Sequence, residues 1–204
     1  MPYCNLNSTA EAYPQGELSG LESSFFGEVR HILTNIMNPQ NLATETLNRL
    51  NHKVIADAIQ KLSEEQGKPD CRGGVLAISI VSNSIPLEEF SSISIGIPGD
   101  RFGHLARNAA EKIARLYDLR ISGSNDVAAS QSANPDAGSY GGCIVFHGKL
   151  GDTYVQIYIS FSGAPAEVDE AVVFVIGEKL GFKAPIYSNP LLTRARELLA
   201  DVVI

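Results

Sequence analysis

Residues 153–161 read TYVQIYISF, and apolar side chains occupy every second position from Val155 to Phe161. Polar or amphipathic residues stand between them. Because successive side chains of a β-strand point to opposite faces of a sheet, this alternation predicts a half-buried antiparallel strand. Such a strand favours a fold in which helices pack against an antiparallel sheet.

Three neighbouring segments also have strand character. Residues 74–81 (GVLAISIV) are apolar on both faces, so we expect a central strand that is covered on both sides. Residues 91–95 alternate, and residues 143–146 form an apolar run that ends at His147, where a turn leads into residues 153–161. Two hairpins are therefore expected.

Apolar residues at helical spacing predict five helices. The predicted helices begin at Leu18, Asn41, Asp100, Pro165 and Asn189. Asn41 and Asp100 are the expected N-caps, the second helix should run unbroken to Gly67, and the last should reach Val202. The buried edge of the third helix is expected to be Phe102, Leu105, Ala109, Ile113 and Leu116. The order α-α-β-β-α-β-β-α-α predicts an α+β fold, an antiparallel sheet flanked by helices.

The composition indicates one domain with a sparsely charged surface. The chain has 204 residues, of which 44% are hydrophobic and 19% are charged. Soluble domains usually carry roughly 25% charged residues, so we expect part of the surface to be buried in a homo-oligomer. A net charge of -7 without any Lys/Arg run excludes an ordinary nucleic-acid-binding surface.

The cysteines and the absence of long apolar runs bear on the compartment. Cys4, Cys71 and Cys143 lie far apart without CxxC spacing, which is typical of a reducing environment. We find no cationic start followed by an apolar h-region, and no apolar run near the roughly 18 residues that cross a membrane. We therefore expect a cytoplasmic protein with no membrane partner.

Glycines concentrate just before the strand at residues 143–146. Tyr140, Gly141 and Gly142 form the centre of this cluster. Glycines here would let backbone N–H groups approach a ligand, although the spacing matches neither a dinucleotide nor a P-loop pattern. The alternative is that they only allow a tight entry into an edge strand.

A second candidate segment, residues 160–170, reads SFSGAPAEVDE. It predicts a strand, a turn at Ser162 and Gly163 and a helix opened by Pro165, and Gly163 is expected to be structurally required. The N–H groups of the helix start would suit an anion such as a carboxylate. Three carboxylates of the first turn would repel an anion and already interact with the helix dipole, so capping is the alternative. They are Glu167, Asp169 and Glu170.

The histidines lack the spacing of a metal site, and no metal is expected. His104, near the start of a helix, and His147, at the end of a strand, should lie close to the end of the sheet. His52 lies off the apolar stripe of its helix, and His31 lies in the N-terminal region. Cys143 is expected to be a small buried hydrophobe.

The segment from Gly141 to Ala171 resembles the GlcG/HbpS-like proteins, which include the C-terminal domain of PduO-type proteins and are often labelled haem-degrading. The most specific match is Ser-Gly-Ala-Pro at residues 162–165 with the following Asp-Glu pair. Residues 76–81 and 110–114 are supporting matches. The division that follows is an N-terminal extension, a family-like domain and a C-terminal helical extension, at residues 1–40, 41–183 and 184–204.

The resemblance implies a profilin-like or PAS-like sheet that assembles into dimers or larger rings. It also implies binding of a small organic ligand, with haem or a related tetrapyrrole as the cofactor, since some members bind haem or corrinoids. We expect the ligand where the two glycine clusters meet. The candidate binding residues are Tyr140, Gly141, Gly142, His104, His147, Ser162 and Gly163.

Two other functions stay open. The protein could be an enzyme that acts on an organic small molecule by acid–base chemistry in a pocket shaped by the 122–139 loop. The proton would then be carried by Tyr140, His147, Asp169 or Glu170. It could also be an assembly protein without a small ligand. A cavity with titratable groups of shifted pKa would favour the enzyme, and a closed strand end would favour assembly.

Overall fold

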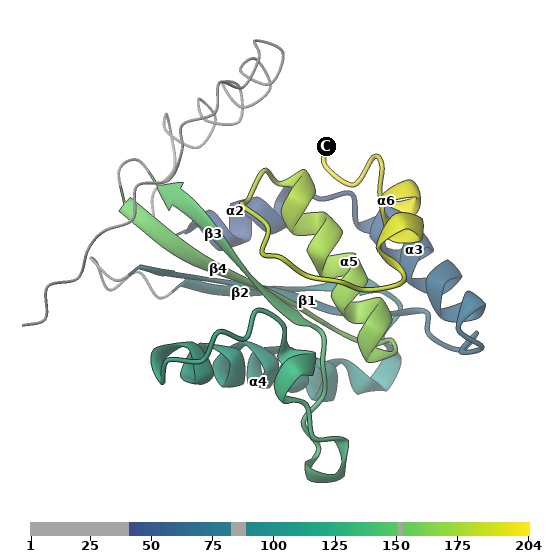
Figure 1. Ribbon diagram of the computed structural model, residues 1–204. Coiled ribbons are helices and arrows are strands. Elements are labelled where there is room, and N and C mark those ends of the chain that lie inside the picture. The colour runs from purple at the N-terminus through teal and green to yellow at the C-terminus, as the bar shows by residue number, and fades with distance from the viewer. Residues whose placement is uncertain (1–40, 83–88, 151–152) are drawn as a thin grey trace, which may run out of the picture.

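The computed structural model describes residues 41–82, 89–150 and 153–204 (Figure 1). The helix predicted from Leu18 lies outside these residues, as does His31. One four-stranded antiparallel sheet forms the centre of the described part. Its strands are β1 (Gly73–Ser82), β2 (Glu89–Gly96), β3 (Cys143–Leu150) and β4 (Thr153–Ser162).

The strand order across the sheet is β2-β1-β4-β3. The two predicted hairpins therefore lie side by side, and β1 pairs with β4 at the centre, with Ile78 opposite Ile159. The α+β fold and the central position of residues 74–81 are confirmed.

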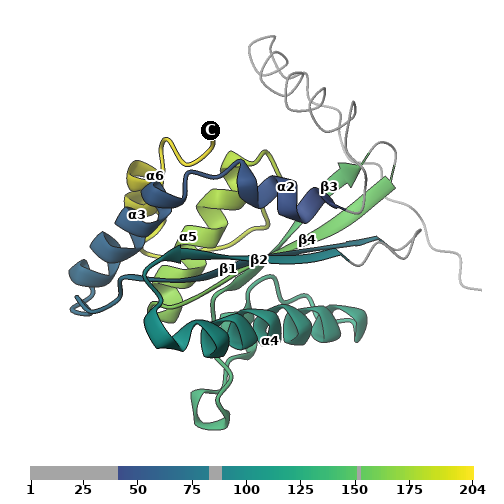
Figure 2. The same cartoon turned by 180° about the vertical axis from the view of Figure 1, so that it is seen from behind.

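Helices cover both faces of this sheet (Figures 1 and 2). α4 (Phe102–Ile121) packs on one face. α2 (Leu42–Asn48), α3 (His52–Glu65) and α5 (Ala166–Lys179) lie on the other, and α6 (Leu192–Leu198) packs on α3 and α5. None of the helices that the structure describes is long and apolar enough to cross a membrane.

β4 is half-buried, as predicted, only up to Gln156, and from Ile157 to Ser162 it is buried on both faces. Ile157, Ile159 and Phe161 belong to the core on the α5 side, as the alternation predicted. Tyr158 and Ser160, between them, are also fully buried, on the α4 side. The second half of this central strand lies between two helical layers and has no solvent face, and tyrosine and serine are small or amphipathic enough to fill the α4 side.

The long helix predicted from Asn41 is in fact two helices. The chain leaves the first helix at Arg49, and Leu50 forms a β-bridge with Val203 near the C-terminus. Asn51 then caps α3, its side chain accepting a hydrogen bond from the N–H of Val54 at 3.3 Å. Asn41 makes no side-chain cap.

Two other helix boundaries differ from the prediction. Asp100 lies in a 3-10 turn (Gly99–Arg101) and does not cap α4 through its side chain, and Phe102 is exposed rather than buried. α6 ends at Leu198, although Val202 beyond it is buried in the same core as α3 and α5. The C-terminal residues thus pack on the main core.

β3 runs past His147 to Leu150, so His147 lies within the strand and not at its end. Its backbone pairs with Gln156 of β4 on one side and with Lys183 on the other. This position separates His147 from the strand end where it was expected.

Candidate functional site

A half-open pocket of about 400 Å³ lies between the first half of α4 and the turn from β4 to α5. Three parts of the chain form it. They are Arg101 of the 3-10 turn with His104, Leu105, Asn108 and Lys112 of α4, the glycine cluster at Tyr140 and Gly141, and Ser162, Gly163, Ala164, Pro165, Ala166 and Asp169 of the turn and α5. The two glycine-containing segments meet at this pocket.

Five of the seven candidate binding residues line the pocket, and a sixth borders it. The five are His104, Tyr140, Gly141, Ser162 and Gly163. Gly142 packs directly against Lys112 and Asp169 at the floor. His147 does not take part, because it neighbours Arg120 near the other end of α4. At a helical rise of 1.5 Å per residue, Arg120 is about 24 Å from His104 along α4.

A buried ion pair forms the floor of the pocket. The Nζ of Lys112 donates to Oδ2 of Asp169 at 3.0 Å and to the carbonyl oxygen of Phe161 at 2.7 Å. The exposed fraction of these two charged side chains is 3% for Lys112 and 2% for Asp169. The other carboxylate oxygen, Oδ1, accepts from the N–H of Ala164 at 3.0 Å, so this carboxylate also holds the turn before α5.

Burial raises the pKa of the Asp169 carboxyl from 3.8 to about 7, against the opposing effects of the Lys112 charge and of the hydrogen bonds from Lys112 and Ala164. A carboxyl group that titrates near neutral pH can both accept and release a proton under physiological conditions. Asp169 therefore has the acid–base property that the enzyme hypothesis requires.

Gly142 leaves room for this ion pair. It has a φ of 112°, and a Cβ there would lie 2.6 Å from Nζ of Lys112 and 2.7 Å from the carbonyl oxygen of Phe161. Its N–H donates to Glu170 and its carbonyl accepts from Phe161. The glycine serves the packing of buried charges, and its N–H already has an acceptor.

Gly163 is required by close approach of two backbones. A Cβ at this position would lie 2.4 Å from the carbonyl oxygen of Gly73 and 2.7 Å from Cα of Gly74, at the start of β1. The turn out of β4 therefore lies directly against the start of β1 with no space for any side chain. This contact brings Ser162 and the start of α5 to the pocket.

Glu170 fastens three segments behind the pocket. Its Oε1 accepts from the N–H groups of Ser130 and Gly142, at 2.8 and 3.0 Å. Its Oε2 accepts from the hydroxyl groups of Ser130 and Tyr187, at 2.7 and 2.6 Å. Only 2% of Glu170 is exposed, so this carboxylate and that of Asp169 act as buried hydrogen-bond acceptors and not only as charges at a helix start.

Ser162 supplies an unused polar group. It is 4% exposed and lines the pocket, and its hydroxyl has no hydrogen-bond partner among the residues described. Ser160, two positions earlier on the same side of β4, has a fully buried hydroxyl without a partner and does not line the pocket. The hydroxyl of Ser162 is not among the fully buried ones, so it is accessible from the pocket and available to a ligand.

The outer wall and rim are polar. Arg101 and His104 are exposed, and Nδ2 of Asn108 lies 3.2 Å from Nε2 of His104. Tyr140 is held at the rim by its carbonyl, which accepts a 2.5 Å hydrogen bond from Arg115. Arg115 also donates to the carbonyl of Ala129 at 3.0 Å and thereby fixes the 122–139 loop on α4.

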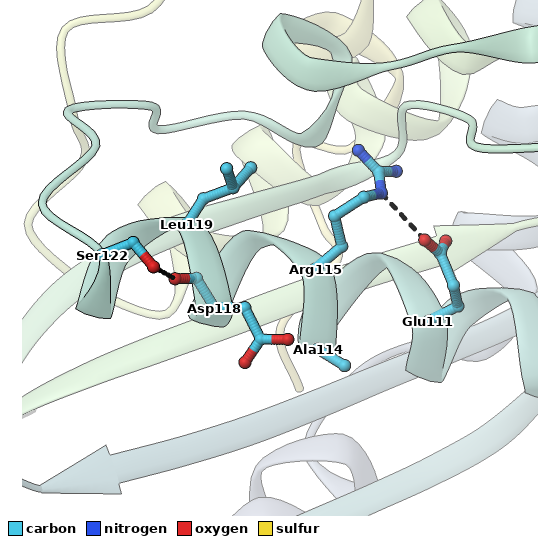
Figure 3. Close-up of a pocket in the computed structure, with 6 residues that line it drawn as sticks. All are labelled: Glu111, Ala114, Arg115, Asp118, Leu119 and Ser122. Atoms are coloured by element: carbon cyan, nitrogen blue, oxygen red, sulfur yellow. Dashed lines mark hydrogen bonds and ion pairs between the residues drawn. The ribbon is translucent and has the colours of Figure 1, made fainter.

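A second hollow lies on the outer side of α4 and is more open (Figure 3). Its volume is about 420 Å³, and several of its polar groups are paired with one another. Nε of Arg115 donates to Glu111 at 2.8 Å, and the hydroxyl of Ser122 donates to the carbonyl of Asp118 at 2.8 Å (Figure 3). This hollow is lined by α4 and its C-cap residue alone, so it offers a ligand no more than an exposed helix surface does.

The remaining candidates lie away from the pocket. Nε2 of His52 lies 3.0 Å from the carbonyl oxygen of Leu47, at the junction of α2 and α3. Partial desolvation, then the charges of Arg120 and Lys183, lower the pKa of His147. Cys143 is fully buried in the core under α4, and burial raises the pKa of its thiol, as expected for a small hydrophobe.

Lys112, at the floor of the pocket, was not among the site residues predicted from the sequence. It lies three residues after Ala109 and four before Leu116, on the apolar stripe of its helix. A single charge on a buried stripe needs a buried partner, and this was the available signal. Among the residues that the structure describes, no three His, Cys, Asp or Glu side chains are grouped as for a metal ion.

Comparison of the chain with protein families, curated proteins and solved structures gave no match. The residues of the pocket therefore carry the argument about function.

Proposed function

We propose that this protein binds a small organic molecule through a carboxylate or similar anionic group in the pocket between α4 and the β4–α5 turn. The observation that carries the proposal is the set of unused donors at the floor. Ser162 has an unpartnered hydroxyl there. Lys112 has two acceptors for three ammonium protons, which leaves one proton for a ligand.

The charges around the pocket favour an anion. Arg101 and Lys112 are cationic, and Asp169 is in part neutralised by its pKa of about 7. Pro165 and Ala166, at the start of α5, also line the pocket. The first N–H groups of a helix have no partners within the helix and attract anions.

The size of the pocket agrees with a small ligand. Its volume of about 400 Å³ lies in the lower part of the range of about 300–1,000 Å³ typical of ligand pockets. The half-open shape suits a molecule whose anionic end reaches the floor while its other end meets Tyr140 at the rim.

The test is calorimetric titration of the full chain with acetate, propionate and benzoate, and with the matching neutral amides. We expect the carboxylates to bind at least about tenfold more tightly than the amides, as one lost charge-assisted hydrogen bond predicts. Ser162→Ala should weaken carboxylate binding, while Ser160→Ala, which removes the same group outside the pocket, should leave it unchanged. Equal binding of acids and amides, or equal effects of the two serine variants, would refute the proposal.

The resemblance to GlcG/HbpS-like proteins implies haem as the ligand, but the pocket residues do not fit a haem. Its floor and wall carry Lys112, Asp169 and Asn108, whereas a macrocycle needs broad apolar surfaces. The imidazole in the pocket, His104, lies within hydrogen-bond distance of Asn108. Titration with haemin should therefore produce no Soret shift that depends on His104. A Soret shift that His104→Ala abolishes and His52→Ala leaves unchanged would restore the haem proposal.

An acid–base enzyme is the second candidate, and the raised pKa of Asp169 favours it. Asp169 would take a proton from a carbon next to the bound carboxylate and return it, with Lys112 positioning the carboxyl. Glu170 is occupied by four hydrogen bonds and His147 lies elsewhere. In D₂O, proton NMR should show exchange at that carbon of propionate with the unaltered protein, and none with Asp169→Asn.

A further inference from the structure

The two edge strands of the sheet, β3 and β2, differ in whether other backbone segments pair with their outer side. β3 is covered on its outer side by β-bridges from Ala128 to Ile144 and from Lys183 to His147. His147 and Lys183 exchange backbone hydrogen bonds of 3.2 and 2.9 Å. β2, the opposite edge, receives no such bridge from any residue that the structure describes.

β2 has no positive-φ residue before Gly96, its last residue, which has a φ of 65°. Its eight residues pair with β1 in unbroken register from Glu89 opposite Ile80 to Gly96 opposite Gly73. The N–H of Ile97 bonds to the carbonyl of Arg72, so residue 97 faces β1. Because backbone groups of an antiparallel strand alternate in direction, those of Phe90, Ser92 and Ser94 point away from β1.

This edge also lacks the features that usually prevent pairing. Residues 90–97 (FSSISIGI) contain no charged residue and no proline. Phe90 is 51% exposed and Ile97 is 76% exposed, and Ser92 and Ser94 are exposed on the α4 side of the strand. Natural proteins protect open edges with lysines, prolines or bulges, so a long edge without them is expected to pair.

We propose that β2 pairs antiparallel with β2 of a second copy of this chain, which makes one continuous sheet across a two-fold axis. The absence of charge along most of β2 favours a second copy of the chain as the partner. The chain carries a net charge of -7, but after its first residue, Glu89, β2 carries no charge, so two copies that pair through residues 90–96 place no like charges opposite each other. A two-fold axis places the same strand on both sides, and an antiparallel arrangement is what such an axis produces.

α4 extends the proposed interface. A strand edge alone buries less than the roughly 1,000 Å² of a stable dimer, so a second element has to contribute. Arg115 holds one side of α4 against the 122–139 loop, and the opposite side carries the small residues Gly103, Ala106 and Ala110. Small side chains let the α4 helices of two copies approach each other below the joined sheets.

The test is sedimentation velocity of the full chain from low to high micromolar concentration. We expect twice the mass of one 21.9 kDa chain. The double variant Ser92→Lys and Ser94→Lys should sediment as a monomer, because it places like charges opposite each other, and Ser94→Pro should do so by removing one outward N–H. The matched control, Gln60→Lys with Gln66→Lys, adds the same charge at exposed positions of α3 and its C-cap and should stay dimeric.

We expect circular dichroism and thermal unfolding to show that each variant is folded, because its changes lie at exposed positions or at an outward N–H. A monomeric mass of the unaltered chain at high micromolar concentration would overturn the proposal. So would a lysine variant and a proline variant that remain folded and as dimeric as the unaltered chain.

Discussion

Nζ of Lys112 lies 3.0 Å from Oδ2 of Asp169, and this ion pair joins helices on opposite faces of the sheet. Lys112 belongs to α4 and Asp169 to α5, and they meet beyond the end of β4, where Lys112 also binds the carbonyl of Phe161 at 2.7 Å. The pair thus connects the two hydrophobic cores and forms the floor of the pocket at the same time.

Lys112→Met should destabilise the protein strongly. The substitution leaves the buried carboxylate of Asp169 without its partner, and breaking a buried pair in this way costs about 3–5 kcal/mol. We expect a correspondingly lower free energy of unfolding in urea at pH 8. Lys112→Met combined with Asp169→Leu should regain part of the loss, since neither charge remains but the N–H of Ala164 loses its acceptor; a double variant no more stable than the single one would contradict this account.

Gly142→Ala should be far more damaging than Gly138→Ala. Both glycines have positive φ, 112° and 76°, so an added Cβ strains the backbone at either position. Only Gly142 has neighbours, with Nζ of Lys112 2.6 Å from the added atom, whereas Gly138 has nothing within 4 Å. We expect Gly138→Ala to lose about 1 kcal/mol and Gly142→Ala at least about 3 kcal/mol in urea unfolding. Equal losses would mean that backbone strain alone requires the glycine.

The stability of the protein should fall as the pH rises from about 4 to about 7, through the contribution of Asp169. Its pKa is about 7 in the folded chain and 3.8 in the unfolded one, so the folded state holds a proton that the unfolded state has released. This contribution is complete below pH 3.8 and lost by pH 7. Asp169→Asn should lack this part of the pH dependence.

Carbon-13 NMR of the Asp carboxyl groups provides the direct measurement. One resonance, absent in Asp169→Asn, should titrate with a midpoint near 7. A midpoint close to the ordinary value of 3.8 would show that Lys112 outweighs burial.

Cys143 should resist alkylation in the native protein. It is fully buried and its thiol pKa is raised by burial, whereas Cys71 is partly exposed. After treatment with iodoacetamide, peptide mass spectrometry should find Cys71 modified in native protein and Cys143 modified only after denaturation. Rapid native modification of Cys143 would show that the core under α4 opens readily.

Local patterns predicted the positions of the strands, because apolar runs and alternating residues mark them, but they did not predict that the second half of β4 is buried on both faces. Residues 74–81 and 153–161 became the central pair β1 and β4. The break between α2 and α3 could not be read in the same way. The apolar spacing continues through Leu50, and the helix ends there because a distant residue, Val203, pairs with its backbone.

The glycine clusters identified the neighbourhood of the pocket but not its floor. Both clusters are local in sequence, whereas the ion pair joins Lys112 to Asp169 across the sheet. The burial of Asp169 and Glu170 depends on which segments fold over the start of α5. The position of these residues in the first turn of a helix does not predict which segments those are. His147 was misplaced because β3 extends beyond the apolar run that defined its predicted end.

The β-bridges that cover β3 limit how many chains can assemble through their sheet edges. A molecule with two open edges can add neighbours on both sides and extend into a fibre. In the described part of this chain Ala128 and Lys183 occupy one edge, so only β2 is left to pair. Once β2 has met a second β2, both outer edges of the joined sheet are β3 strands that are already covered. Neither chain of the proposed dimer then offers an open edge to a third chain, so assembly through β2 stops at the dimer.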